Sequence, residues 1–211
     1  MNAENHYDAI IIGGGAAGLF CSAVAASRGK KTLVLESQST FGKKIAISGG
    51  GKCNFTNLNS GKQYYRSENP HFCISALSQF TQFDFIKLVE RNNIEYYEKK
   101  LGQLFCKHSS KQIIQMLLDE NARHHAELKT NTHIVDIQHS DIGYSTTTNH
   151  GIFVSDSVVI ATGGLSIPKL GASDFAFQLA KKFNLETVAP YPALTPIVYS
   201  HDIAHFSEIA G

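Results

Sequence analysis

Three glycines and one acid stand at a spacing that could bind a dinucleotide. Gly13, Gly15 and Gly18 form the pattern G-x-G-x-x-G, and Glu36 follows further along the chain. The first glycine of such a pattern permits a tight turn, the second lets the backbone approach a pyrophosphate, and the third lets a helix pack closely on a strand. A carboxylate at Glu36 could accept hydrogen bonds from ribose hydroxyls and would disfavour a 2′-phosphate. The chemistry indicated is the binding of a dinucleotide other than NADP.

The segments around these residues match the elements that such a site needs. The apolar run 7–12 predicts a buried parallel strand, and 16–27 predicts a helix that ends at a basic, glycine-containing stretch. Residues 31–35 predict a second strand with Glu36 at its tip. The open amides and the dipole at the start of the helix favour a bound anion. This context argues against a glycine-rich surface turn.

A second glycine-rich stretch lies between residues 42 and 57. It contains three consecutive glycines, Gly49–Gly51, which suggest a close backbone approach to another group. Nearby lysine and asparagine side chains offer donors for phosphate or ring heteroatoms. Considered alone, the stretch fits a flexible loop as well as a binding loop.

The two glycine-rich strings together resemble a known family. Ile-Ile-Gly-Gly-Gly-Ala-Ala-Gly, followed by Lys-Lys-Ile-Ala-Ile-Ser-Gly-Gly-Gly-Lys-Cys-Asn-Phe-Thr-Asn, is similar to the bacterial BaiN-type NAD(P)/FAD-dependent oxidoreductases, also called aminoacetone-oxidase-like flavoproteins. The resemblance implies a bound FAD, NAD(P)H as a possible electron donor, and an approach of the loop 43–57 to the FAD. It also implies that the backbone of Val135 meets the adenine, although the residue considered alone is a core valine.

A third segment agrees with this resemblance. Residues 156–160 predict a buried strand that leads into Ala161, Thr162 and Gly163, which resembles the return strand of FAD-binding domains. Small residues at such a place let the backbone pass close to a nucleotide. The residues expected to contact the cofactor are Gly13, Gly14, Gly15, Ala16, Ala17, Gly18, Glu36, Ser37, Lys43, Lys44, Ser48, Gly49, Gly50, Cys53, Asn54, Val135, Ala161, Thr162 and Gly163.

The remaining periodicity completes the predicted fold. The aromatic-rich stretch 71–92 predicts two helices broken near Thr81, and its aromatic stripe is typical of core or inter-domain packing. The expected class is α/β, a Rossmann-like parallel sheet with helices and a small antiparallel sheet. Further predicted elements are a helix at 110–123, a helix ending at Phe183, and strands at 94–98, 104–106, 128–130, 132–138, 144–148 and 151–155.

Composition limits the classes of function. The chain has 211 residues and a net charge of +1, which gives no electrostatic argument for nucleic acid or an acidic membrane. The four cysteines form no C-x-x-C pair, so neither a metal site nor a disulfide framework is indicated. We therefore expect a cytoplasmic protein without a nucleic-acid or membrane partner, and the flavoprotein resemblance implies a small organic substrate. No catalytic residue and no oligomeric state can be assigned; Cys53 is the one candidate near a flavin ring, with a structural role favoured.

Prolines near the end of the chain mark an expected domain boundary. Pro190, Pro192 and Pro196 indicate an exit from a first, FAD-binding domain at 1–195. The stretch 196–211 is expected to begin a second, β-rich domain, because members of the resembled family run to about twice this length. Three functions remain open: an FAD-dependent oxidoreductase, a nucleotide-binding remnant without turnover, and an NAD-binding dehydrogenase domain.

Overall fold

The computed structural model of the chain describes residues 6–192. Tertiary contacts divide the chain into two compact units, residues 1–176 and 177–211. The domain boundary expected at residue 195 and the β-rich domain expected from residue 196 lie outside the described residues. The two sheets found within residues 6–192 belong to the first unit.

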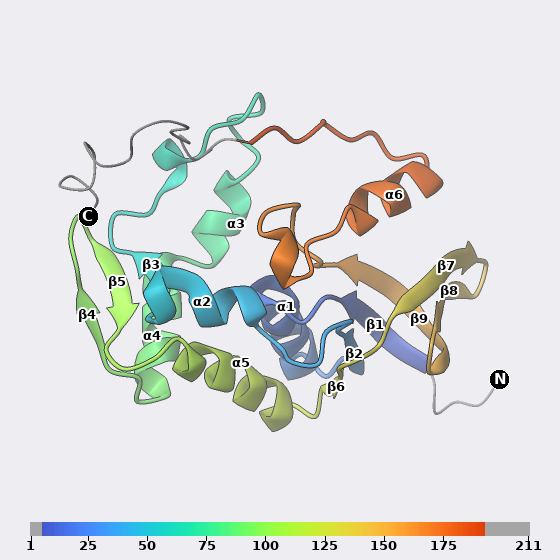
Figure 1. The fold of residues 1–211 in the computed structure, drawn as a ribbon, viewed down its shortest axis with the longest axis horizontal. Coiled ribbons are helices and arrows are strands. Elements are labelled where there is room, and N and C mark those ends of the chain that lie inside the picture. Colours follow the sequence, from blue (N-terminus) through green and yellow to red (C-terminus); the bar gives the residue numbers. More distant parts are fainter. Residues whose placement is uncertain (1–5, 193–211) are drawn as a thin grey trace, which may run out of the picture. The chain divides into compact units, whose positions relative to one another are not determined.

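The larger sheet has six strands in the order β6-β2-β1-β9-β8-β7 (Figure 1). β1 lies between β2 and β9 and runs parallel to both, and β6 extends the parallel part beyond β2. β7 and β8 add an antiparallel edge. The strands are β1 (His6–Ile12), β2 (Thr32–Leu35), β6 (Glu127–Lys129), β7 (Ile134–Ser140), β8 (Gly143–Thr148) and β9 (Gly151–Ile160). The α/β class and the inner position of the first strand are thus confirmed.

One strand replaces two that the sequence predicts. Residues 151–155 and 156–160 form the single ten-residue strand β9. The pairing of β9 with β1 continues across the expected break, because Tyr7 lies opposite Ser155 and Ala9 lies opposite Ser157. No glycine or proline stands at this point, and the polar pair Ser155-Asp156 therefore does not end the strand.

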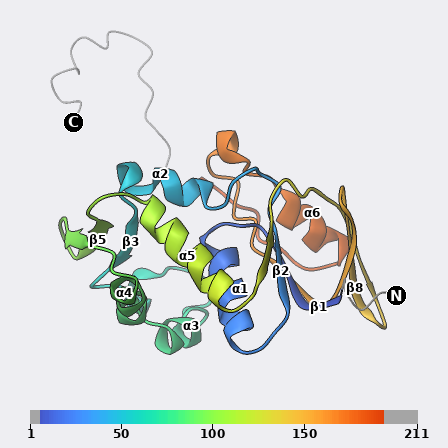
Figure 2. The same cartoon turned by 90° about the horizontal axis from the view of Figure 1, so that it is seen from below.

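Two long helices pack together beside the parallel strands. α1 (Ala16–Ser27) lies alongside α5 (Lys111–Arg123), as Figure 2 shows. Leu19 of α1 and Leu117 of α5 are buried in the same apolar cluster. α1 ends as predicted, because Gly29 adopts a φ of +78° and its amide donates to the carbonyl oxygen of Ala26 at 2.9 Å.

The smaller sheet has three antiparallel strands in the order β3-β5-β4. These are β3 (Asn54–Asn57), β4 (Tyr96–Glu98) and β5 (Gln103–Cys106), and the pairing expected between 94–98 and 104–106 is confirmed. Two helices, α3 (Ile74–Gln79) and α4 (Gln82–Arg91), break at Thr81 as predicted. Thr81 begins α4 with a capping box, since its hydroxyl accepts the amide of Asp84 and the Asp84 carboxylate accepts the amide of Thr81.

Part of the aromatic stripe of this region serves packing, as expected, whereas Phe72 and Phe83 are 81% and 53% exposed. Phe80 and Phe85 meet Phe20 of α1 with ring centroids 4.9 and 6.4 Å apart. Phe55 of β3 contacts both Phe85 and Tyr96, at 6.0 and 5.6 Å. The rings therefore join α1, α3 and α4 to the small sheet.

The second glycine-rich stretch is not the continuous loop that the sequence allows. Residues 43–51 form α2 (Lys43–Gly51), which is interrupted by non-helical backbone at Ser48, Gly49 and Gly50, and β3 follows. Ile45 is buried in the core cluster and anchors the helical part. The remaining short elements are η2 (Lys62–Tyr64), η3 (Pro168–Leu170) and α6 (Phe175–Lys182).

Within residues 6–192, none of the helices combines the length and the apolar character that crossing a membrane requires. A cytoplasmic location stays a prediction.

Candidate functional site

Three strands of the parallel sheet end side by side at the predicted site. The amide of Gly13, just after β1, donates to the carbonyl oxygen of Leu35 in β2 at 2.8 Å. The amide of Ala161, just after β9, donates to the carbonyl oxygen of Ile12 at 2.8 Å. Open α/β sheets bind ligands at the carboxyl ends of their strands. The fold thus brings three distant parts of the sequence to one edge.

The glycines of the first motif differ in what surrounds them. A Cβ on Gly18 would lie 1.9 Å from the carbonyl oxygen of Gly13, so the close packing of α1 on the first turn requires glycine. Gly13 has a φ of +108°, and its Cβ would lie 2.5 Å from the carbonyl oxygen of Ala161. A Cβ on Gly15, in contrast, would meet no atom within 4 Å. Gly15 therefore faces open space directly before the helix.

The start of α1 is suited to an anion. Gly15 is the N-cap residue, no side chain caps the helix there, and the first turn contains no acid. Ala16 and Ala17 are exposed in that turn. Backbone amides at a helix start point outward and carry partial positive charge. The geometry can therefore accept a phosphate group beside Gly15.

Glu36 is held against the glycine turn. Its Oε2 accepts the amide of Gly14 at 2.7 Å and its Oε1 accepts the amide of Gln38 at 2.8 Å. The hydroxyl of Ser37 donates more weakly, at 3.4 Å. Each carboxylate oxygen has two lone pairs, so Glu36 keeps capacity for ribose hydroxyls while both backbone bonds persist.

Gln38 is a residue of this site that the sequence reasoning missed. Its backbone amide donates to the Glu36 carboxylate, and its backbone carbonyl oxygen accepts the backbone amide of Asn131 at 3.0 Å. Its side-chain oxygen accepts a hydrogen bond from the Lys43 ammonium at 2.7 Å. Three chain segments therefore meet at one glutamine. Its position two residues after the acid at the strand tip was the available signal, because a side chain there lies at the same sheet edge.

The start of α2 joins the same edge. The amide of Gly42 donates to the carbonyl oxygen of Gly14 at 2.9 Å. The ammonium of Lys44 donates to the carbonyl oxygen of Gly164 at 3.3 Å and lies 3.6 Å from where a Cβ on Gly163 would stand. Lys43 and Lys44 thus place two positive charges beside the glycine turn and the end of β9.

Thr162 carries a polar atom that lacks a partner. Its hydroxyl oxygen is buried, and among residues 6–192 no group hydrogen-bonds to it. A buried hydroxyl without a partner costs free energy, so such a group calls for an explanation. A ligand that passed the ends of β1 and β9 could supply the missing bond. The open space at Gly15, the uncapped helix and this hydroxyl together fit a dinucleotide such as FAD.

The other end of α2 does not join this edge through its side chains. The hydroxyl of Ser48 donates to the carbonyl oxygen of Ile45 at 2.7 Å, and the Asn54 side-chain amide reaches the carbonyl oxygens of Leu104 and Thr56, both at 3.1 Å. These bonds are internal to α2 and the small sheet. Gly49 and Gly50 are exposed at positive φ, and Gly50 faces open space, so a ligand approach at these glycines stays a prediction.

Cys53 belongs to the core. Its side chain is 6% exposed and lies in the same apolar cluster as Cys106 and Leu19. Burial raises the pKa of its thiol, which a hydrogen bond with Ser48 offsets only in part. The structural role favoured from the sequence agrees with this burial, and the expected cofactor contact from the side chain does not.

Val135 is far more exposed than its apolar side chain suggests. It is 70% exposed and stands where the pairing of β7 with β8 shifts register, so the interpretation as a core valine is wrong. Just before β7, the amide of Thr132 donates to the carbonyl oxygen of Glu36 at 2.9 Å. That bond brings the start of the segment to the site, while the adenine contact of Val135 stays a prediction.

Two known proteins of similar sequence have different function names. A protein of Escherichia coli (strain K12) named ribosomal RNA dihydrouridine synthase is 45% identical over 190 residues, which are 90% of this chain and 48% of that protein. A 3-dehydro-bile acid delta(4,6)-reductase of Clostridium scindens is 28% identical over 208 residues, 95% of this chain and 49% of that protein. The chain thus spans about half the length of these relatives.

A comparison with a solved structure and a match to a family model both place a Rossmann-like fold in this chain. The crystal structure of glycine oxidase from Geobacillus kaustophilus superposes with a TM-score of 0.57 at 18% identity, over 86% of this chain and 59% of that one, which shows the shared fold. The family model described as HI0933-like protein Rossmann domain matches residues 7–191. This match covers most of the sequence, including the glycine turn, Glu36 and the end of β9. The chain therefore belongs to the HI0933-like Rossmann-domain family.

Proposed function

We propose that the chain is the FAD-binding part of a flavin-dependent reductase. The observation that carries this proposal is the open space at Gly15, directly before a helix start that no side chain caps and no acid neutralises. A pyrophosphate could lie there with its oxygens on the amides of the first helical turn. Bound FAD would supply two-electron redox chemistry that protein side chains lack.

The residues around Gly15 would divide the remaining contacts. The Glu36 carboxylate, already fixed by Gly14 and Gln38, would accept hydrogen bonds from ribose hydroxyls. Lys44, beside Gly163, would add a positive charge near the phosphates, and the buried Thr162 hydroxyl would gain a partner. The backbone segments that carry these residues are already tied to the sheet edge.

The names of the two relatives describe reactions of the same type. Dihydrouridine is formed by reducing the C=C bond of uracil, which is conjugated to a ring carbonyl. A 3-dehydro bile acid with Δ4 and Δ6 bonds likewise has C=C bonds conjugated to its 3-keto group. We therefore propose that the substrate class is a C=C bond conjugated to a carbonyl, reduced with electrons from NAD(P)H.

Within this class, a uridine of ribosomal RNA is the favoured substrate. The relative with that name is 45% identical, against 28% for the bile acid reductase. This proposal departs from the expectation of a small substrate without nucleic acid, which rested on the overall net charge. Net charge averages over the whole surface and does not report a local patch.

A cofactor and turnover assay tests the proposal. The purified protein should show an oxidised-flavin spectrum and release FAD on denaturation. Under anaerobic conditions NADPH or NADH should bleach that spectrum, and unmodified ribosomal RNA should restore it while mass spectrometry detects uridines that gained two hydrogens. A Δ4,6-3-keto steroid serves as the small-substrate comparison. Recovery of NAD without flavin would contradict the proposal, and reoxidation by the steroid alone would overturn the RNA substrate but retain the reductase.

A further inference from the structure

A group of exposed aromatic and basic side chains lies beside the small sheet, away from the glycine turn. It consists of Lys62, Tyr64, Tyr65, Arg66, Lys100 and Leu101, and is called the aromatic–basic surface below. The first four belong to the segment between β3 and α3 in Figure 1, and the last two to the β4–β5 turn. Tyr64 is 66% exposed and Tyr65 is 51% exposed.

Backbone and amide bonds fix the two segments against each other. The amide of Leu58 donates to the carbonyl oxygen of Gly102 at 2.8 Å, and the Asn57 side chain donates to the carbonyl oxygen of Leu101 at 3.0 Å. The chain then reaches Lys62 and the short helical turn η2. The aromatic–basic surface is therefore held at its β4–β5 end by the small sheet.

The cations of this surface are unpaired. Within the described part of the chain, no ion pair or hydrogen bond engages the side chains of Lys62, Arg66 or Lys100. Elsewhere cations do find acids, as in Lys30 with Asp8 at 2.9 Å and Lys107 with Glu95 at 2.7 Å.

Two acids lie close to these cations in the sequence. Glu98, next to the β4–β5 turn, has an oxygen occupied by the amide of Gly102 at 3.0 Å. Glu68 stands two residues after Arg66 and is exposed. Three unpaired cations against these two acids leave the aromatic–basic surface with a net positive charge.

We propose that the aromatic–basic surface binds single-stranded RNA. This inference rests on the proposed function, because it assigns the RNA of that reaction to a surface of this chain. Exposed rings at the same place as free cations are the combination that single strands require, since bases stack on the rings and phosphates pair with the cations. A folded protein partner would leave the three cations desolvated unless it supplied matching acids.

Fluorescence anisotropy with a short fluorescein-labelled oligouridylate tests this surface on the whole protein. Tyr64→Ala/Tyr65→Ala removes the rings, and Tyr64→Phe/Tyr65→Phe retains them. Lys62→Ala/Arg66→Ala removes two charges, and Arg28→Ala/Lys87→Ala removes two exposed charges outside the surface. Circular dichroism of each variant checks the fold.

The expected results separate stacking from charge. The double alanine change at the tyrosines should weaken binding by about fivefold to 150-fold per lost stack, while the phenylalanine variant binds like the wild type. Lys62→Ala/Arg66→Ala should reduce the slope of log affinity against log salt by about 1.4, since each phosphate contact contributes about 0.7 for single strands. The Arg28/Lys87 variant should keep both affinity and slope.

The proposal would be overturned if the wild type and both alanine variants bound the oligouridylate with equal affinity, or if the wild type did not bind it. It would also be overturned if Arg28→Ala/Lys87→Ala weakened binding as much as the changes within the surface. Tighter binding of an oligouridylate–oligoadenylate duplex than of the single strand would also overturn it, because paired bases cannot stack on the rings. Flavin content, read from the visible spectrum of the same samples, reports on the proposed function separately. Loss of RNA binding in the variants without any flavin would support the surface and contradict the reductase.

Discussion

The Glu36 carboxylate accepts the backbone amide of Gly14 at 2.7 Å, which couples the tip of β2 to the glycine turn after β1. The acid that would recognise the ribose therefore also helps to hold the turn that would bind the pyrophosphate. A second bond, from the amide of Gln38 to the other carboxylate oxygen at 2.8 Å, fixes the side chain further. Such fixation reduces the entropy that the side chain would lose when a ligand binds.

Replacement of Glu36 should weaken FAD binding. Glu36→Ala should reduce FAD affinity by about 1–3 kcal/mol, the range for hydrogen bonds to a charged group. Glu36→Gln keeps an acceptor oxygen, so its FAD affinity should fall less than that of Glu36→Ala. Fluorimetric titration with FAD measures the affinity of both variants, and Ser39→Ala, at an exposed serine of the same connection, is the control. Unchanged affinity in Glu36→Ala, with an unchanged urea midpoint, would make Glu36 an ordinary surface acid.

The parts of the fold that local sequence determines were predictable. The apolar run of β1, the spacing of the glycines and the Gly29 stop define the first strand and α1 without reference to distant residues. Thr81 likewise begins α4 through a bond to Asp84, three residues away. These features depend on contacts within a few residues, which a single sequence displays.

Features that depend on distant segments were not predictable in the same way. The bond between Gln38 and Asn131 joins residues far apart in the chain, and no local pattern indicates it. Val135 is exposed because β7 shifts register against β8, and no residue type indicates that shift. The side chain of Cys53 points into the core because β3 pairs with β5, so the glycine-rich string alone did not reveal its burial.

The two core cysteines should resist alkylation in the folded protein. Burial raises the pKa of the Cys106 thiol to about 11, with a smaller contribution from the neighbouring Cys53. At pH 8 only about one Cys106 in a thousand would then be a thiolate, the reactive form. Timed iodoacetamide labelling with peptide mass spectrometry should modify Cys73, which is half-buried, before Cys53 and Cys106. Labelling in urea should make the modification rates of these cysteines similar. Rapid modification of Cys106 in the native protein at pH 8 would contradict this prediction.

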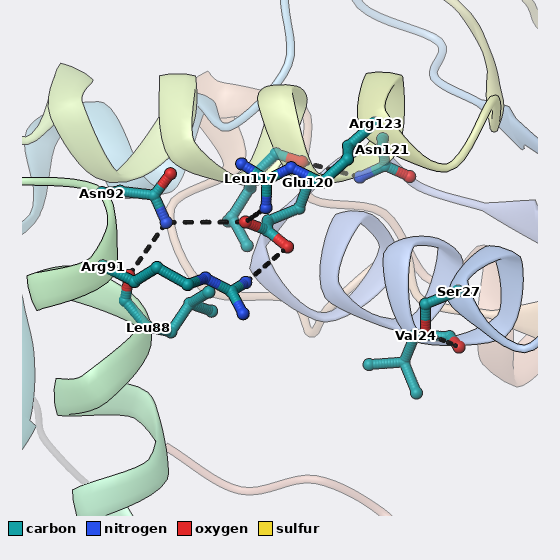
Figure 3. A network of polar contacts seen from close by, with 9 residues as sticks. All are labelled: Val24, Ser27, Leu88, Arg91, Asn92, Leu117, Glu120, Asn121 and Arg123. Atoms are coloured by element: carbon teal, nitrogen blue, oxygen red, sulfur yellow. Dashed lines mark hydrogen bonds and ion pairs between the residues drawn. The ribbon is translucent and has the colours of Figure 1, made fainter.

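Glu120 should make stability depend on acidic pH. Its side chain is only 9% exposed, and its carboxylate lies between Arg91 of α4 and Arg123 of α5 (Figure 3). Burial alone would raise the pKa of Glu120, but the hydrogen bonds and charges of Arg91, Asn92 and Arg123 outweigh it and hold the pKa below its ordinary 4.5. The unfolded chain therefore takes up this proton first as the pH falls, so the contribution is complete above pH 4.5 and is lost on acidification.

Urea unfolding of wild type and Glu120→Gln across this pH range measures the effect. At pH 7 the variant should be less stable by about 1–3 kcal/mol, because hydrogen bonds to a charged group are replaced by weaker ones. The difference should shrink as the pH falls below 4.5, where the wild-type carboxylate becomes protonated. Glu90→Gln, which changes an exposed acid on α4, is the control. A difference that stays constant with pH would show that Glu120 acts through packing rather than charge.

Gly15 and Gly18, three residues apart, should separate cofactor binding from folding. In Gly18→Ala the new Cβ would lie 1.9 Å from a backbone oxygen that cannot rotate away, so the helix must move from the turn. The gain of about 1 kcal/mol from replacing glycine inside a helix is smaller than the cost of overpacking, about 1–3 kcal/mol or more.

In Gly15→Ala the φ of −86° suits alanine and the Cβ meets no atom within 4 Å, so the urea midpoint should change little. That Cβ would nevertheless occupy the space proposed for the pyrophosphate, and FAD affinity should fall at least about tenfold, or 1.4 kcal/mol. FAD titration and urea unfolding of both variants provide the comparison. If Gly15→Ala bound FAD as tightly as the wild type, the pyrophosphate would not pass over this glycine, and the assignment of the site would be wrong.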